Sequence, residues 1–389
     1  MQKRIGLVLL ILLLVISQAG CWDADEINEL GFVLCVALDR SGNEYKVTTQ
    51  IAKPETYSKT PSGGSQPKQQ QPFWVISATG KTIFEAIRNL ANISPRRIFW
   101  AHIKVIIIGE ELARHNIHDV LDFFSRNPEL RLRTLIAVTP GEAGKLLDII
   151  PIMEKDPATD LERIIENRNL SGKGYRIMLK NFLEDYLEPN GNPVASRVIL
   201  CKSEGTPVIK LNGAAVFRKN KMVGWLNEKE TRGLLWVENE INNTLMVINC
   251  PYDNKPVTVE LNSGKTSLKS RIQNGIPYYE INTQTTANVV EQECATNFID
   301  PARLHKLEKT LASAINQDIQ STVIAVQNLG VDFLGLNEIL HRQNTKEWKQ
   351  LSGNWSEVLN QIKFDFSTKA EIPSVSVLAK PLAPAEKVR

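Results

Sequence analysis

Apolar and polar positions in the first half of the chain predict strands that alternate with helices. A continuous apolar run at residues 31–38 and a run of β-branched residues with one lysine at residues 103–108 indicate buried strands, because a strand covered on both faces shows no polar alternation. Residues 45–51 and 73–78 favour further strands, and residues 81–91 repeat apolar side chains every three or four positions, as an amphipathic helix does. This pattern predicts an α/β-like region in which helices cover a sheet.

The rest of the first half continues the alternation. Residues 154–200 are more polar, and Pro189 and Pro193 mark the end of a helix there. The further predicted elements are helices at 110–114, 117–125, 141–150 and 175–187, and strands at 134–138 and 198–200.

The second half has a different pattern, in which alternating strands precede one long helix. Asp300 and Pro301 favour a helix start, because aspartate caps free amides and proline suits the first turn, and Gly330 favours the helix end. Apolar side chains between them recur every three or four residues, which predicts one buried helix face. The other predicted elements are strands at 208–211, 214–217, 222–225, 245–250, 257–261, 267–273, 278–290, 362–366 and 374–378, and helices at 228–237, 336–342 and 346–351.

These patterns predict a mixed α+β fold, with an N-terminal α/β-like region and a C-terminal region of β-meander and long helix. We place the boundary so that the two domains span residues 21–203 and 204–380. Residues 61–72 are polar and rich in Pro, Gly, Ser and Gln, which predicts a mobile surface loop inside the first domain. The tail at residues 381–389 is rich in proline and charge, and we expect it to fray.

Residues 1–20 resemble a signal peptide. Lys3 and Arg4 precede an apolar run from residue 5 to residue 16, and this run is shorter than the ~20 residues that span a bilayer. Gly20 and Cys21 fit the cleavage junction of a bacterial lipoprotein signal, at which the cysteine becomes a lipidated N-terminus. The alternative is an ordinary secreted protein that is cut elsewhere, with Cys21 an incidental thiol. We expect the lipoprotein, held on one side of a membrane by covalent lipid on Cys21.

The charge balance bears on the partners of the mature chain. The 389 residues include 46 Lys and Arg against 43 Asp and Glu, and removal of the leader takes away two of the basic residues, Lys3 and Arg4. A chain this close to neutral is not typical of proteins whose main partner is nucleic acid.

The remaining cysteines carry no spacing signature. They are widely separated and form no Cys-x-x-Cys pair of the kind used for zinc or redox chemistry. Export permits disulfides, and the sequence leaves open whether any form. These cysteines are Cys35, Cys201, Cys250 and Cys294.

No set of residues indicates catalysis or a cofactor other than the covalent lipid. His115 and His118 are three positions apart with Asp119 beside them, but their polar surroundings favour exposed histidines over metal ligands. Residues 141–145 resemble part of a phosphate loop, yet Thr139 replaces its first glycine and Leu146 its Ser or Thr. This segment is better interpreted as a strand-to-helix turn. We therefore expect a protein that is not an enzyme and holds no metal.

One dense patch of basic and aromatic side chains accompanies the predicted strand at 103–108. Arg96, Arg97, Trp100 and Lys104 fall within a short stretch of the sequence. Arg and Trp are over-represented in interface hot spots, so that this stretch is our candidate partner-contact face, with Trp100 as its anchor. The alternatives are that the charges are solvated strand ends and that Trp100 belongs to the core.

Several sequence blocks resemble the Ger(x)C family, the lipoprotein C subunits of spore germination receptors in spore-forming Firmicutes. One block begins at the Gly20-Cys21 junction, and another contains Trp100 and Lys104. The blocks lie at residues 20–23, 26–31, 99–113, 121–124, 128–131, 213–217, 223–226 and 231–236.

The resemblance implies a subunit of a nutrient germinant receptor. Such a receptor also has two integral membrane subunits, and its lipoprotein lies on the outer face of the spore inner membrane. Membrane lipid and those two subunits would be the partners, and the implied fold is mixed α and β. The alternative function is a solute-binding lipoprotein of a membrane transporter, which normally has two similar α/β lobes, whereas the two halves of this chain differ in pattern.

Overall fold

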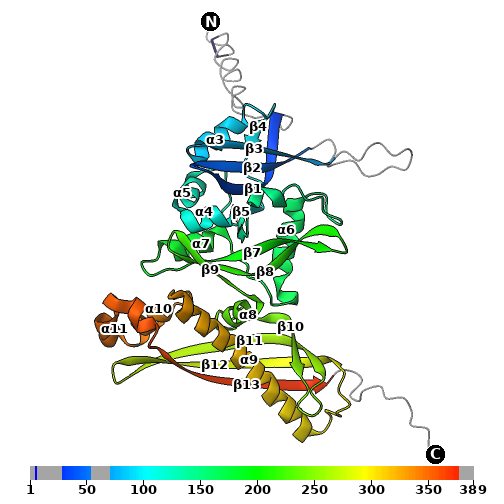
Figure 1. Ribbon diagram of the computed structural model, residues 1–389, viewed down its shortest axis with the longest axis vertical. Coiled ribbons are helices and arrows are strands. Elements are labelled where there is room, and N and C mark those ends of the chain that lie inside the picture. The colour runs from blue at the N-terminus through cyan, green and yellow to red at the C-terminus, as the bar shows by residue number, and fades with distance from the viewer. Residues whose placement is uncertain (1–4, 7–28, 54–70, 376–389) are drawn as a thin grey trace, which may run out of the picture.

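The computed structural model describes residues 5–6, 29–53 and 71–375. The Gly20-Cys21 junction, most of the segment 61–72 and the tail 381–389 lie outside these residues. Within the described part of the chain, one sheet has nine strands and a second has four (Figure 1). The first sheet belongs to the N-terminal half and the second to the C-terminal half, which confirms the mixed α+β fold predicted from the sequence.

The first sheet is parallel at its centre and antiparallel at its two sides. Strands β1, β5, β6 and β7 run parallel, while β2 and β3 on one side and β8 and β9 on the other pair antiparallel. The short strand β4 adds a parallel pair to the beginning of β1. The bounds are β1 (Leu30–Ser41), β2 (Glu44–Ala52), β3 (Phe73–Gly80), β4 (Arg97–Phe99), β5 (Val105–Gly109), β6 (Leu135–Thr139), β7 (Val194–Ser203), β8 (Thr206–Arg218) and β9 (Lys221–Leu226).

Both faces of the central strands are buried, as the continuous apolar runs predicted. Val36 and Leu38 of β1 join one hydrophobic cluster, and Cys35 and Ala37 join another because successive side chains of a strand point to opposite faces. The helices that cover the first face are α3 (Ile83–Leu90), α4 (Glu110–His115), α5 (His118–Arg126) and α7 (Leu179–Leu187), and the second face is covered by the 3₁₀ turn η2 (Ala143–Leu146) and α6 (Pro157–Glu166).

Three details of the first half differ from the sequence prediction. The helix expected at 141–150 is wrong, since this segment holds the short turn η2 and no α-helix. Helix α6 was missed because its segment is polar, although Asp156 accepts a hydrogen bond from the Thr159 amide and Pro157 occupies the first turn. The helix expected from residue 175 begins at Leu179.

The first sheet continues past the predicted domain boundary. Strands β7 and β8 form a hairpin, and residues 203 and 204 lie at its turn. Strand β8 is a single strand where two were expected, and Gly213, between the two expected strands, adopts φ +84° at an irregularity in the pairing with β7. The division into domains at residue 203 therefore stays a prediction, and strands β8 and β9 complete the sheet of the N-terminal half.

The second sheet combines a meander with one parallel closing strand. Its order is β10-β11-β12-β13, and β13 runs parallel to β12 after a long helical excursion. Strands β11 and β13 are each continuous where the sequence pattern suggested two strands, and residues 376–378 of the last predicted strand lie outside the described residues. The bounds are β10 (Asn242–Asn249), β11 (Pro256–Gln273), β12 (Ile276–Gln292), α9 (Pro301–Leu329), α10 (Leu336–Gln343), α11 (Thr345–Leu351), α12 (Trp355–Leu359) and β13 (Lys363–Val375).

Helix α8 (Glu228–Val237) connects the two sheets and packs against α9 (Figure 1). It starts in a capping box, in which the Asn227 side chain accepts from the Glu230 amide and Glu230 accepts from the Asn227 amide. A Cβ atom on Gly233 would lie 2.2 Å from the Asp318 carbonyl oxygen of α9. The two helices therefore approach so closely that only glycine fits at this position.

A buried ion pair joins the same two helices. Arg232 of α8 donates through Nε and Nη2 to the two carboxylate oxygens of Asp318 of α9, at 2.6 and 3.1 Å. The Asp318 side chain is only 2% exposed. Burial raises the pKa of Asp318, while the Arg232 guanidinium opposes that rise.

We predict that Arg232→Ala lowers the free energy of unfolding by about 3 kcal/mol, because the mutation leaves Asp318 buried and unpaired. Arg342→Ala is the matched control, since Arg342 pairs with Glu338 on the surface, and it should cost less than about 0.5 kcal/mol. Urea denaturation measures both values. Equal losses for the two variants would show that the buried pair contributes no more than a surface pair.

Candidate functional site

A groove of about 1100 Å³ lies over the N-terminal sheet, between helices α3 and α5 and strand β4. The turn between β1 and β2 and the loop after α5 complete its walls. The groove thus draws on segments that are far apart in the sequence, and two residues of the predicted contact face, Arg97 and Trp100, line it.

The groove has an aromatic wall on the two helices. Phe84 of α3 is 53% exposed, and its ring centroid lies 6.3 Å from that of Phe123 of α5. The Arg88 guanidinium sits over the Phe84 ring at 4.9 Å from the centroid. Exposed aromatic rings beside guanidinium groups are typical of protein-interaction surfaces.

Charged side chains of both signs surround this wall. The Tyr45 hydroxyl donates to Asp119 at 2.5 Å, and burial together with this carboxylate raises the pKa of Tyr45 to about 12. The Arg126 guanidinium, 77% exposed, pairs with Asp122 at 2.7 Å. The groove therefore offers an apolar wall and a polar rim that contains both cations and anions.

Arg97 and Trp100 meet the same acidic residue at one end of the groove. The Arg97 guanidinium lies 3.7 Å from a Glu129 carboxylate oxygen, and the Trp100 backbone amide donates to the other oxygen at 3.1 Å. The Arg97 side chain is 59% exposed. Trp100 is only 5% exposed and packs in the hydrophobic core. The structure thus places Trp100 where the core alternative predicted, beneath the groove and not as a projecting anchor.

Lys104 does not lie with Arg97. Its ammonium group pairs with Glu162 of α6 at 2.7 Å and donates to the Thr159 hydroxyl at 3.2 Å. Helix α6 covers the second face of the sheet, so that Lys104 is separated from the groove by the sheet itself. Arg96 is half-buried at the start of β4. Of the four predicted contact residues, the structure therefore brings Arg97 and Trp100 together at the groove, with Arg96 next to them.

The two histidines considered as metal ligands have separate surroundings. Both are exposed at the junction of α4 and α5. A His118 ring nitrogen lies 2.9 Å from the Tyr186 hydroxyl, while Asp119 accepts from Tyr45. His115, His118 and Asp119 are thus not directed at one common point.

The segment that resembles a phosphate loop binds a carboxylate of its own chain. Asp39, 4% exposed, accepts from the Ala143 amide at 2.7 Å and from the Gly144 amide at 2.9 Å. Burial raises the pKa of Asp39, and the two amides oppose that rise. Because Asp39 takes these donors, the segment is a structural turn that holds η2 against β1. The strand-to-helix turn predicted from the sequence is therefore a turn, but a 3₁₀ turn follows it in place of an α-helix.

Comparison with known proteins decides the family. Residues 23–200 match the family described as spore germination protein N-terminal domain, and residues 212–375 match spore germination B3/GerAC like, C-terminal. The chain belongs to the GerAC family of spore germination proteins. The resemblance predicted from the sequence blocks is thereby confirmed.

Two GerAC relatives match along nearly their whole length. Spore germination protein B3 of Bacillus subtilis (strain 168) is 27% identical over 375 residues, which cover 94% of this chain and 97% of the relative. Spore germination protein KC of the same organism is 23% identical over 401 residues, which cover 98% of each chain. The crystal structure of the GerBC protein has the same fold, with a TM-score of 0.57 and 23% identity over 87% of this chain and 97% of that chain.

These matches also bear on the alternative function. Both halves of the chain match germination domains, in the order in which the GerAC family carries them, so that the solute-binding lipoprotein is not favoured. Among the residues that the structure describes, no helix is long and apolar enough to span a membrane.

The GerAC groove contains residues that the sequence analysis did not find. Glu129, Tyr45 and Phe84 lie far apart in the sequence and meet only because α3, α5 and the β1–β2 turn converge. Glu129 falls inside the block at 128–131 that carried the family resemblance, and that block was the one signal that could have pointed to it.

We predict that Trp100→Ala lowers the free energy of unfolding by about 3–5 kcal/mol, because it leaves a cavity beneath the groove. Phe84→Ala removes a half-exposed ring from the same groove and should cost less than about 1 kcal/mol. Chemical denaturation followed by circular dichroism measures both. A stable, fully folded Trp100→Ala protein would contradict the core position of this side chain.

Proposed function

We propose that this chain is the lipid-anchored, non-enzymatic subunit of a spore nutrient germinant receptor. It acts with two integral membrane subunits on the outer face of the spore inner membrane. The observation that carries this proposal is the pair of germination domains that together cover residues 23–200 and 212–375. Covalent lipid on Cys21 supplies the anchor, and contact through the groove supplies the coupling to the membrane subunits.

The groove lies close to the proposed anchor along the chain. Leu30 at the start of β1 pairs with Arg97 of β4. Leu30 follows Cys21 by nine positions, and nine residues reach at most ~30 Å at full extension. With Cys21 as the anchor, the start of β1 and the neighbouring Arg97 stay within about 30 Å of the membrane surface, within reach of the membrane subunits.

The Cys35 thiol supports the non-enzymatic role. Cys35 is fully buried, and burial raises its pKa far above the ordinary value. A nucleophilic cysteine needs a lowered pKa and access to substrate, and Cys35 has neither.

The anchor is tested by Cys21→Ala, which we expect to release the protein from membranes or to leave its leader uncleaved. A lipidated cysteine carries more than one acyl chain, and stable anchoring takes more than one. Fractionation after a carbonate wash is the measurement, with Cys201→Ala as the matched control because Cys201 lies half-buried in β7. Cys21→Ala protein that is cleaved and still pellets with membranes would rule out the lipid anchor.

The contact is tested by Arg97→Glu, which reverses an exposed charge at the rim of the groove. We expect about tenfold weaker co-purification with the membrane subunits and slower nutrient germination, since a reversed charge meets repulsion at a complementary surface. Arg163→Glu is the control, because Arg163 is 66% exposed on α6 over the other face of the sheet.

Both variants should fold normally by circular dichroism. Loss of assembly in Arg163→Glu, with normal assembly in Arg97→Glu, would place the contact on the other face. Normal assembly in both would remove the groove from the proposal and leave the receptor assignment in place.

A further inference from the structure

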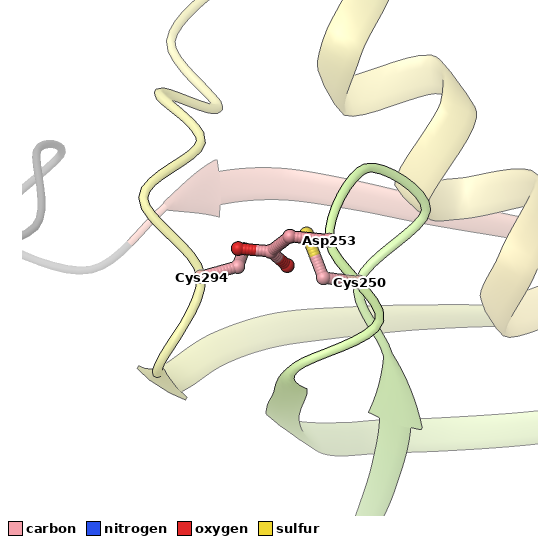
Figure 2. Close-up of side chains that lie close together, drawn as sticks. All are labelled: Cys250, Asp253 and Cys294. Atoms are coloured by element: carbon pink, nitrogen blue, oxygen red, sulfur yellow. The ribbon is translucent and has the colours of Figure 1, made fainter.

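Two buried cysteines and one exposed aspartate converge at one end of the C-terminal sheet. Cys250 directly follows β10, Asp253 lies in the turn before β11, and Cys294 follows β12 (Figure 2). The ligand atoms of the three side chains all lie within 4.8 Å of one another. This is the one such group of three His, Cys, Asp or Glu residues in the part of the chain that the structure describes.

The backbone holds the three residues in place. The turn is closed by the Cys250 amide, which donates to the Lys255 carbonyl at 2.7 Å, and by the Asn254 amide, which donates back to the Cys250 carbonyl at 3.0 Å. The Gln292 side chain donates to the Cys294 carbonyl at 3.0 Å. The positions of the two sulfur atoms are therefore set by ordered backbone on both sides.

The three side chains differ in their exposure to solvent. Cys294 is 0% exposed and Cys250 is 2% exposed, so that both sulfur atoms are shielded from water. Asp253 is exposed at the surface above them. The Lys255 amide donates to Asp253 Oδ1 at 3.2 Å, and the Ala295 amide and the Cys250 thiol also donate to this carboxylate, so that it is oriented toward the sulfur atoms. A cation could reach the sulfur atoms from the side of Asp253.

The spacing of the three atoms suits a small cation. Three atoms within 4.8 Å of one another all lie within about 2.8 Å of a common point, which is 4.8 Å divided by the square root of three. Zinc bonds are ~2.3 Å to sulfur and ~2.0–2.2 Å to carboxylate oxygen, so that shifts of a few tenths of an ångström complete the site. A disulfide needs the sulfur atoms at ~2.05 Å and leaves the position of Asp253 without a role.

We propose that Cys250, Asp253 and Cys294 bind a zinc ion. Two thiolates and a carboxylate are ligands that zinc accepts in a tetrahedral arrangement, with water at the fourth position on the exposed side. The ion ties the turn after β10 to the segment that leads from β12 into α9. No spacing motif marks the site, because the two cysteines are separated by the whole of β11 and β12.

The test uses the full chain, purified without chelator in mild detergent. Metal analysis by mass spectrometry should find about one zinc per chain, and cobalt replacement should give the charge-transfer absorption of thiolate ligands. Chelation should lower the melting temperature by about 5 °C, and added zinc should restore it. A chromophoric chelator in competition measures the zinc affinity.

Variants separate the site from folding effects. Cys250→Ser and Cys294→Ser should each weaken zinc affinity by at least about a hundredfold, and Asp253→Asn by about tenfold with an unchanged circular dichroism spectrum. Cys201→Ser, a thiol outside the cluster, should bind like the unchanged chain. Affinity no tighter than micromolar, equal affinity in Cys250→Ser and Cys201→Ser, or a Cys250–Cys294 disulfide in protein taken directly from membranes would each overturn the proposal.

Discussion

The close packing of α8 on α9 is the constraint on which the arrangement of the two sheets depends. Gly233 lets the helix backbones meet, and the Arg232–Asp318 pair neutralises the one acidic side chain that this contact buries. Arg218 of β8 adds to the joint by donating to the Leu329 and Gly330 carbonyls at the end of α9. Helix α8 directly follows β9, and the end of α9 is bonded to Arg218 of β8. Both helices therefore join the C-terminal sheet to the N-terminal sheet.

The local pattern of apolar and polar residues predicted those elements whose burial is visible in their own sequence. The apolar runs of β1 and β5 and the cap residues of α9 are of this kind. The prediction failed where residues far apart in the sequence determine the local structure. The segment around η2 is held by Asp39, and β11 runs unbroken through Gly264, where the Trp236 ring lies 2.4 Å from the position that a Cβ would take.

The candidate site, too, was predicted only where its residues are neighbours in the sequence. The basic and aromatic stretch was visible in the sequence, but Lys104 pairs with Glu162 of α6 on the other face of the sheet, and Trp100 is buried under the groove. The groove itself depends on the convergence of α3, α5 and β4, for which no local signal exists. The cysteines of the C-terminal sheet were likewise visible only as isolated residues. Family resemblance identified the germination protein, whereas only the fold located the groove.

The central claim is that the chain works by contact between its N-terminal groove and membrane partners. Hydrogen–deuterium exchange of the full-length protein in lipid nanodiscs, with and without the two membrane subunits, tests this claim most directly. We predict slower exchange in the complex at residues 83–90, 97–100 and 118–126, which form the groove walls. Unchanged exchange in these three segments, together with protection confined to the C-terminal sheet, would contradict it.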